Sequence, residues 1–391
     1  MQIERDQELE AAELEASRRA SEGQLPLSVL LQDAAQLEAS HIHLEPSGNG
    51  IDIAFRSAGL LHGYRELDAL QGGVLVRRIA AAAGLSPASP LPQRGRLAWD
   101  EEPLDVSMLP LRRGQRIVLQ RAARKTGHRK LEALGMSCPL AQQVRAALDG
   151  AGLVLVAAPA GHGRSTTLQT LLGLAATRTR PGLGVAAHVL GELPGVAWAD
   201  ASTVAAAETV RAAVEQDIDV LMIDSLEDRA AAAAAVQAAQ AGRLVLAGVA
   251  AADSVAAIQQ MRSWRIEAFH LASALSLVLG QRLIRRLCAA CREPVQATGS
   301  VSALLGFDPG TIVHAPVGCE ACGHSGFAGH TGVFEAIRGD ATIRRLINDG
   351  GDAAILARHA FISAPNLGSA ARALARSGVT TPEEAVKISR G

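Results

Sequence analysis

Residues 153–167 read LVLVAAPAGHGRSTT, and the predicted fold class follows from them. The apolar run Leu153–Ala158 is typical of a buried strand, and the residues after Thr167 repeat Leu and Ala at helical spacing. A glycine-rich turn joins the two. A strand, a glycine-rich turn and a helix N-terminus form a P-loop, in which backbone N–H groups and the helix dipole hold phosphate. The stretch therefore predicts an α/β domain with a phosphate site where its strand ends.

The P-loop pattern G-x-x-x-x-G-K-[ST] is matched only in part. Gly163 and Ser165 agree with it, whereas Ala158 stands at the first glycine and Arg164 at the lysine. A guanidinium is longer than an ammonium, planar and forked, so it cannot contact phosphate in the same geometry. Two interpretations follow: a nucleotide site with altered phosphate contacts, or a glycine turn that only joins strand to helix. The residues that would bind nucleotide are Gly161, His162, Gly163, Arg164, Ser165 and Thr166.

Residues 131–391 alternate strands with helices, which predicts a parallel sheet. Val220–Asp224 and Leu244–Val249 are short apolar runs typical of buried strands. Asp224 ends the first of these runs, where P-loop proteins place a magnesium-binding aspartate. We therefore expect Ser165 and Asp224 to hold the Mg²⁺ of a bound ATP.

Residues 26–121 show a mixed pattern that predicts a smaller α+β domain ahead of the α/β domain. His41–Glu45 and Ile51–Arg56, for example, alternate apolar and polar residues as half-buried strands do. The charged residues 1–25 predict a mobile helix. The basic stretch 122–130 contains a glycine and predicts a linker between the domains.

The overall composition excludes some classes of protein. The 391 residues carry a formal net charge of −1, and 3% of them are aromatic. A protein that coats nucleic acid needs a basic surface to neutralise phosphates, so we expect no nucleic-acid partner. The sequence has neither a secretory signal nor a run of roughly 18 apolar residues. We therefore expect a cytoplasmic protein without direct membrane insertion.

Four of the five cysteines form two C-x-x-C pairs within residues 288–322. Two such pairs in a reducing compartment supply four thiolates on tight turns, which suits tetrahedral zinc. Four thiolates leave no open coordination position, so a structural Zn²⁺ site is expected. The alternative is buried free cysteine, and Cys138 is expected to be a lone small apolar residue. The pairs are Cys288 with Cys291 and Cys319 with Cys322. After this segment the sequence predicts short helices.

Five short runs carry a family resemblance. They are Ser40–Pro46 (SHIHLEP), Phe55–Leu61 (FRSAGLL), Leu91–Arg96 (LPQRGR), Gln281–Cys288 (QRLIRRLC) and Gly323–Glu335 (GHSGFAGHTGVFE). They are similar to S-D-I-H-I-E-P, F-R-I-D-G-x-L, L-P-Q-D-G-R, Q-R-L-V-R-R-L-C and T-G-Y-R-G-R-T-G-I-Y-E of the type II secretion and type IV pilus assembly ATPases. Over roughly residues 26–391 the chain resembles a divergent member of this family.

The resemblance implies a fold and a role. The fold is a PAS-like α+β domain followed by a RecA-like motor domain, assembled as a homo- or hetero-hexamer. The role is ATP-driven motion passed to inner-membrane platform proteins of a secretion or pilus machine, with the chain peripheral to the membrane through these partners. Because residues 1–25 alone precede the α+β domain, recruitment is expected to differ from that of longer relatives. Arginines of the N-terminal domain face nucleotide in this family. The candidates here, with solvated ion pairs as the alternative, are Arg56, Arg94, Arg96, Arg116 and Arg121.

The catalytic motifs depart from the family's pattern. Residues 186–190, including Ala187, have none of the acids of E-D-P-x-E. Ser225 replaces the glutamate of G-E-I-R-D, and Ala250 replaces the histidine of L-H-T-N-D. Asp105 stands where R-V-S has arginine. A carboxylate that activates water contributes about 10²–10⁴-fold to rate, and serine cannot replace it as a base. No catalytic residue of the family is therefore intact.

Three hypotheses follow. The first is a nucleotide-binding subunit with weak or lost ATP hydrolysis. The second is an active ATPase motor for secretion or pilus assembly that uses Arg164, Asp224 and Glu227 in unusual roles. The third is a zinc-bearing nucleic-acid protein, which the near-zero net charge disfavours.

Overall fold

The computed structural model describes residues 25–389, apart from 58–59, 100–102, 122–129, 187–188, 190–191, 201–205 and 309. The chain divides into two compact units, Met1–Arg124 and Lys125–Gly391. The predicted N-terminal helix in residues 1–25 and the predicted linker in 122–130 lie almost wholly outside the described residues, and both stay predictions.

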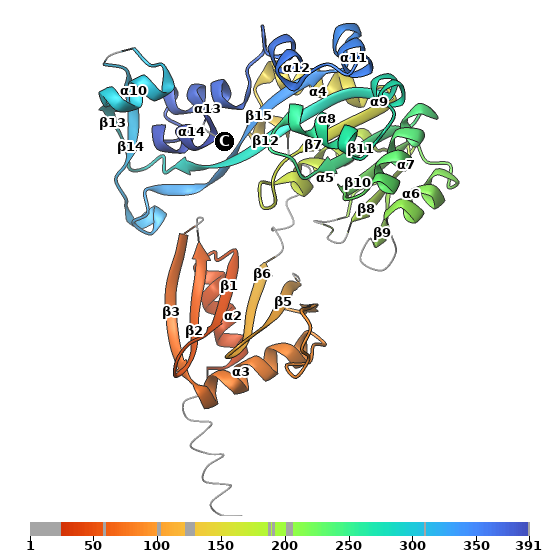
Figure 1. Ribbon diagram of the computed structural model, residues 1–391. Coiled ribbons are helices and arrows are strands. Elements are labelled where there is room, and N and C mark those ends of the chain that lie inside the picture. Colours follow the sequence, from red (N-terminus) through yellow and green to blue (C-terminus); the bar gives the residue numbers. More distant parts are fainter. Residues whose placement is uncertain are drawn as a thin grey trace, which may run out of the picture. The chain divides into compact units, whose positions relative to one another are not determined.

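The described part of the first unit is a six-stranded antiparallel sheet in the order β3-β2-β1-β6-β5-β4 (Figure 1). Its apolar face packs against two helices, because the strands alternate buried and exposed residues. In β1, for example, Ile42 and Leu44 are buried, whereas His41 and His43 lie on the other face. The elements are α2 (Leu27–Gln36), β1 (His41–Pro46), β2 (Gly50–Ser57), β3 (Leu60–Asp68), α3 (Ala69–Ala82), β4 (Gln93–Leu97), β5 (Leu104–Leu111) and β6 (Gly114–Arg121).

The second unit is built on a sheet that has seven strands within the described residues, in the order β15-β12-β7-β11-β10-β8-β9. All neighbours pair in parallel except β15, which runs antiparallel to β12. The strands are β7 (Gly152–Ala157), β8 (Gly182–Ala186), β9 (Val196–Asp200), β10 (Val220–Leu226), β11 (Leu244–Val249), β12 (Leu275–Leu287) and β15 (Phe327–Arg338). The predicted α/β fold with a mostly parallel sheet is confirmed.

Helices cover both faces of this sheet, which explains why β7 and β11 are buried at every position. One face packs against α4 (Cys138–Leu148) and α5 (Arg164–Ala175). The other face packs chiefly against α6 (Ala206–Val214), α7 (Arg229–Gln240), α8 (Ser254–Ser263) and α9 (Ala268–Ala274). Alternate residues of β7 therefore enter two separate cores.

The segment after Leu283 differs from the prediction. Instead of passing directly into cysteines and short helices, the chain continues through β12 and later returns along it as β15. Between them lie β13 (Arg292–Gln296), α10 (Gly299–Leu305) and β14 (Ile312–Pro316). Short helices follow only after β15, as α11 (Ala341–Asn348), α12 (Ala353–Ala360), α13 (Leu367–Arg376) and α14 (Pro382–Ser389). The expectation of short helices thus holds for the last fifty or so residues.

The three tryptophans occupy different places in the two units. Trp99 packs against the core of the first unit, and Trp264 packs against the core that contains α7 and α9. Trp198 of β9 lies directly over Gly184 of β8, where a Cβ atom would clash with the indole ring. The glycine at position 184 therefore makes room for the ring.

Candidate nucleotide and metal sites

The predicted nucleotide-binding residues form one turn between β7 and α5. β7 ends at Ala157, and α5 begins at Arg164. Gly161 has φ 76° and Gly163 has φ 80°, a left-handed conformation that glycine adopts without steric cost. The first N–H groups of a helix have no partner inside the helix, and the dipole makes this end attractive to anions. The turn therefore has a geometry that suits an anion such as phosphate.

Arg164 lies across the ends of the neighbouring strands. Its Nη2 donates to Ser225 Oγ at 3.2 Å. Its stem passes over Gly248 of β11, where a Cβ atom would come within 2.9 Å of Arg164 Cδ and Nε. The side chain that replaces the P-loop lysine thus contacts the residue that stands at the family's glutamate.

Three buried polar atoms at this place have no hydrogen-bond partner among the described residues. They are Nε and Nη1 of Arg164 and Oδ1 of Asp224. Leaving such an atom unpaired costs about 1–3 kcal/mol, and more for a charged group. Guanidinium N–H groups suit a phosphate, and a carboxylate oxygen suits Mg²⁺. The residues present therefore fit a magnesium–nucleotide complex.

The end of β10 aims these side chains. The pairing of β10 with β11 shifts register between Ile223 and Leu226, and Asp224 and Ser225 lie within the shift. Such irregularities re-aim side chains next to functional sites. Glu227 lies beyond the end of β10 and is exposed.

Two aspartates of the family-like motifs serve as helix caps. Asp228 accepts a hydrogen bond from Ala231 N at 2.8 Å at the start of α7, and Asp253 accepts from Ala256 N at 2.7 Å at the start of α8. Ala250 is exposed just after β11. Ala187 lies outside the described residues. The motif acids that remain at positions 228 and 253 thus have a structural use.

Sequence reasoning missed Gln281 as a residue of this site. It is 2% exposed, and its Nε2 donates to the carbonyl oxygen of His162 at 2.7 Å. Its Oε1 accepts from Thr167 Oγ1 at 2.6 Å. The signal was its place at the start of the family-like run Gln281–Cys288 (QRLIRRLC).

His162 is held from the same strand. Its Nδ1 accepts from the backbone N–H of Leu283 at 3.0 Å. Burial lowers the pKa of His162, and Arg282 and His330 lower it further. The lowered pKa favours the neutral imidazole, and the hydrogen bond from Leu283 requires an unprotonated Nδ1.

In the first unit, arginines proposed to face nucleotide take part in ion pairs. Arg96 Nε lies 3.2 Å from Asp105 Oδ1, and Arg116 Nη2 lies 2.6 Å from Glu45 Oε1. Asp105, which stands at the family's arginine, thus pairs with a neighbouring strand. Exposed pairs of this kind contribute little to stability, about 0–1 kcal/mol.

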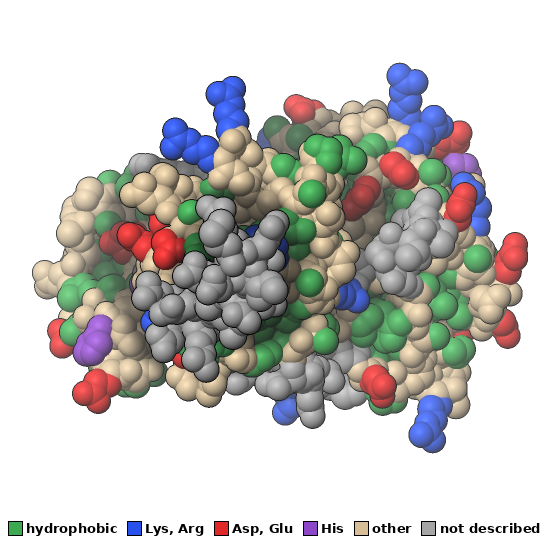
Figure 2. Space-filling view, turned by 90° about the horizontal axis from the view of Figure 1, so that it is seen from below, with side chains coloured by type: hydrophobic (Ala, Val, Ile, Leu, Met, Phe, Trp, Pro, Cys, Tyr) green, Lys and Arg blue, Asp and Glu red, His purple; other side chains and the backbone are tan. Residues whose placement is uncertain are grey.

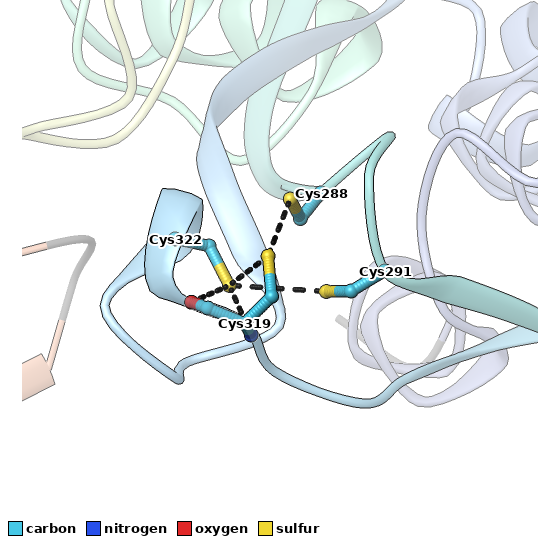
Figure 3. Close-up of side chains that lie close together, drawn as sticks. All are labelled: Cys288, Cys291, Cys319 and Cys322. Atoms are coloured by element: carbon cyan, nitrogen blue, oxygen red, sulfur yellow. Dashed lines mark hydrogen bonds between the residues drawn. The ribbon is translucent and has the colours of Figure 1, made fainter.

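The four cysteines of the C-x-x-C pairs converge (Figure 3). Cys288 and Cys291 follow β12, and Cys319 and Cys322 lie on the turn after β14. All four sulfurs lie within 4.8 Å of one another, and three of the pairs are 3.8–3.9 Å apart. A tetrahedral zinc with metal–sulfur bonds of about 2.3 Å places its sulfurs roughly 3.8 Å apart. The cluster is therefore consistent with zinc.

Backbone donors favour the thiolate form of Cys322. Its Sγ accepts from the N–H groups of Cys319 and Gly326, each at 3.2 Å. These bonds, with those of the neighbouring thiols, lower the pKa of Cys322 to about 6, whereas burial and the neighbouring thiols raise the pKa of Cys291 to about 11. Cys138 lies apart from this cluster, as predicted, and its side chain is exposed at the start of α4.

The surface adds two observations. On the face shown in Figure 2, acidic and basic side chains are interspersed rather than gathered by sign. None of the helices in the described part of the chain has the length and apolar character that crossing a bilayer requires.

Solved structures share this fold. The ATPase DotB of Legionella pneumophila aligns with a TM-score of 0.68 and 14% identity, over 94% of this chain and 97% of that one. The pilus retraction motor PilT, solved with bound ADP, aligns with a TM-score of 0.65 and 15% identity, over 94% and 98% of the two chains. At such low identities the likeness concerns the fold alone.

Relatives by sequence are closer. Type II secretion system protein E of Pseudomonas aeruginosa is 34% identical over 379 residues, which cover 93% of this chain and 75% of that protein. Type II secretion system ATPase E of Vibrio cholerae is 29% identical over 377 residues, with the same shares covered. The family described as "Type II/IV secretion system protein" matches residues 22–387. The chain belongs to this family of secretion ATPases.

Proposed function

We propose that this chain is a nucleotide-binding, traffic-ATPase-like subunit of a type II secretion or type IV pilus assembly system, with weak or lost ATP hydrolysis. The observation that carries this proposal is the contact between Arg164 and Ser225, with unpaired N–H groups on the same guanidinium. The unpaired N–H groups suit a phosphate. The residue that Arg164 contacts is a serine at the position of the family's catalytic glutamate.

Nucleotide binding would use groups that the fold already brings together. The N–H groups of the turn at 161–166 would donate to phosphate oxygens. The unpaired N–H groups of Arg164 would add charge-assisted hydrogen bonds to the phosphate. Ser165 and Asp224 would hold Mg²⁺, since Asp224 Oδ1 is buried without a partner. The phosphates of ATP would accept from these N–H groups, and Mg²⁺ would bind the two oxygens.

Hydrolysis needs a group that orients or deprotonates water, and Ser225 is a poor base. Its hydroxyl oxygen also accepts a hydrogen bond from Arg164 rather than facing water alone. Phosphoryl transfer relies on positioning and charge neutralisation acting as a unit. Exchanges at positions 164, 225 and 250 together therefore predict slow turnover.

The finer architecture and partners rest on the family. We infer that the second unit is a RecA-like motor domain and the first a PAS-like domain, within a homo- or hetero-hexamer. The four cysteines would hold structural zinc. The chain would work in the cytoplasm, at the inner membrane through platform proteins, without nucleic acid.

The test is nucleotide binding and turnover on one preparation of the full chain. A fluorescent ATP analogue is titrated with and without Mg²⁺, and phosphate release is then followed. We expect magnesium-enhanced binding and turnover at least about 100-fold below that of Vibrio cholerae ATPase E in the same assay. Arg164→Ala should weaken binding at least tenfold, whereas Arg145→Ala, in an exposed ion pair on α4, should not change it.

Two outcomes would contradict the proposal. A chain that binds no nucleotide in either condition would exclude the nucleotide site. Turnover at the relative's rate would exclude lost hydrolysis and favour the active motor, and Glu227→Gln would then show whether that carboxylate takes part.

A further inference from the structure

We propose that Gln281 is a positioning residue for the phosphate loop, which fixes the peptide between His162 and Gly163 so that its N–H faces the phosphate. This inference rests on the proposed nucleotide site and names the residue that shapes it. Gln281 itself touches no phosphate in this arrangement. It acts from beneath the loop, on the side of β12.

Strand β12 extends beyond the end of its neighbour β7. β7 pairs with β12 as far as Ala157, which lies opposite Gly280. β7 then ends, and the chain turns into the loop, but β12 continues to Leu287 because β15 pairs with it on its other edge. On the edge where β7 has ended, Gln281 and Leu283 therefore lie beside the loop instead of beside a strand.

The side-chain amide of Gln281 is bonded at both its nitrogen and its oxygen. Gln281 uses both ends of its amide, donating to the His162 carbonyl and accepting from Thr167 Oγ1. A carbonyl oxygen can only accept, so the amide has one orientation that satisfies both contacts. Leu283 N–H adds a third bond, to His162 Nδ1. The loop is thus held at its turn and at the first turn of α5.

The bond to Gln281 fixes the orientation of the peptide between His162 and Gly163. In a trans peptide the C=O and the following N–H point in opposite directions. The His162 carbonyl points to Gln281 under the loop, so the N–H of Gly163 points away from β12, to the side where phosphate binds. Glycine permits this peptide to flip at little cost, and a flipped carbonyl would repel phosphate. Gln281 prevents the flip.

The packing agrees with this role. A Cβ atom at position 163 would lie 2.8 Å from Gln281 Nε2, so the loop and the amide are in direct contact. Gln281 and Thr167 are 2% and 1% exposed, which keeps water from competing for their bonds.

The experiment compares three variants of the full chain. Gln281→Met keeps the length and removes both bonds, and Gln281→Glu keeps the shape but turns a carboxylate toward the His162 carbonyl. Thr167→Val removes only the bond to Oε1. The exposed Gln142→Met on α4 is the matched control. The probes are ADP, inorganic tripolyphosphate and adenosine, since only the first two need the loop.

We expect both Gln281 variants to bind ADP and tripolyphosphate at least tenfold more weakly, and Thr167→Val to lose about threefold or less. Any binding of adenosine should not change. Hydrogen exchange of the loop, measured without nucleotide, should be faster in Gln281→Met than in the wild type, by a larger factor than the exchange of the buried strand β7. A purely structural amide would leave the ratio between the ADP and adenosine affinities unchanged, even where the melting temperature falls.

The outcomes separate the two proposals. A wild type that binds neither ADP nor tripolyphosphate overturns the proposed nucleotide site itself. A wild type that binds both, with Gln281→Met and Gln281→Glu within twofold of it, overturns the positioning role and leaves nucleotide binding intact. If Gln281→Met does not fold, nucleotide binding by Gln281→Glu and the loop exchange rate of Thr167→Val decide between the two roles.

Discussion

Arg164 and Ser225 occupy two positions where the family's motifs carry lysine and glutamate, and here they form a hydrogen bond with each other. Each exchange can be read from the sequence alone. Their contact cannot, because it joins residues 61 positions apart through the ends of α5 and β10. Nor does the sequence show that Gly248 leaves the space for the longer arginine stem.

The two loop glycines offer a matched test at this scale. Both have positive φ, but a Cβ atom at Gly161 meets nothing within 4 Å, whereas one at Gly163 meets Gln281. Gly161→Ala should therefore lower the free energy of unfolding by about 1 kcal/mol, the backbone cost alone. Gly163→Ala should cost roughly 1–3 kcal/mol more, since the amide must move. Denaturant unfolding without nucleotide measures both, and equal losses would exclude the steric contact.

At the scale of elements, the sequence predicted what depends on local pattern. The apolar runs at 153–158, 220–224 and 244–249 are strands of the parallel sheet, because full burial needs a continuous apolar run. β12 and β15 were missed because their pairing joins distant segments and their polar residues obscure the period. Gln281, Arg285 and Glu335 are polar, yet each is satisfied by a partner that only the fold provides.

Glu384 of the C-terminal helix α14 forms a salt bridge with Arg285 of β12. Glu384 accepts from Arg285 Nη2 at 2.9 Å and from Lys387 Nζ at 2.6 Å. Burial raises the pKa of Glu384, but the hydrogen bonds from Lys387 and Arg285 outweigh it, so the pKa is lowered overall. A lowered pKa contributes stability above the unfolded-state pKa, and this stability is lost as the pH falls through the folded-state value.

Glu384→Gln should therefore destabilise the chain at neutral pH and less so in acid. We expect a loss of about 3 kcal/mol in the free energy of unfolding at pH 7, because the change leaves Arg285 with an unpaired charge. The difference from wild type should shrink as the pH falls below the ordinary glutamate pKa of about 4.3 and through the lower pKa of the folded-state carboxyl. Urea unfolding at several pH values checks this. The exposed neighbour Glu383→Gln is the control, and a loss that does not vary with pH would point to packing instead.

At the scale of the whole molecule, the formal net charge of −1 agrees with the mixed acidic and basic side chains on the face shown in Figure 2. The paired cysteines predicted a cluster, which the fold assembles from two turns that are distant in sequence. The division into Met1–Arg124 and Lys125–Gly391 gives each part its own core.

Metal removal tests the four-cysteine cluster in the intact chain. We expect purified protein to carry a single zinc per chain by plasma mass spectrometry. Cys291→Ser or Cys319→Ser should lower this content and expose the segment 288–326 to protease, because the two turns are then held by fewer bonds. Cys138→Ser should change neither, since that thiol is exposed and lies outside the cluster. Wild-type protein without zinc after metal-supplemented expression would exclude the site.

The indole over Gly184 gives the polypeptide a natural reporter. Only three tryptophans and one tyrosine are present, so ultraviolet emission comes from very few sources. Phenylalanine in place of Trp264 would leave Trp99 and Trp198 as one emitter in each unit. Melting curves recorded from such a chain, and from versions lacking one emitter, would show whether its two halves lose their order together or in turn, without any attached dye.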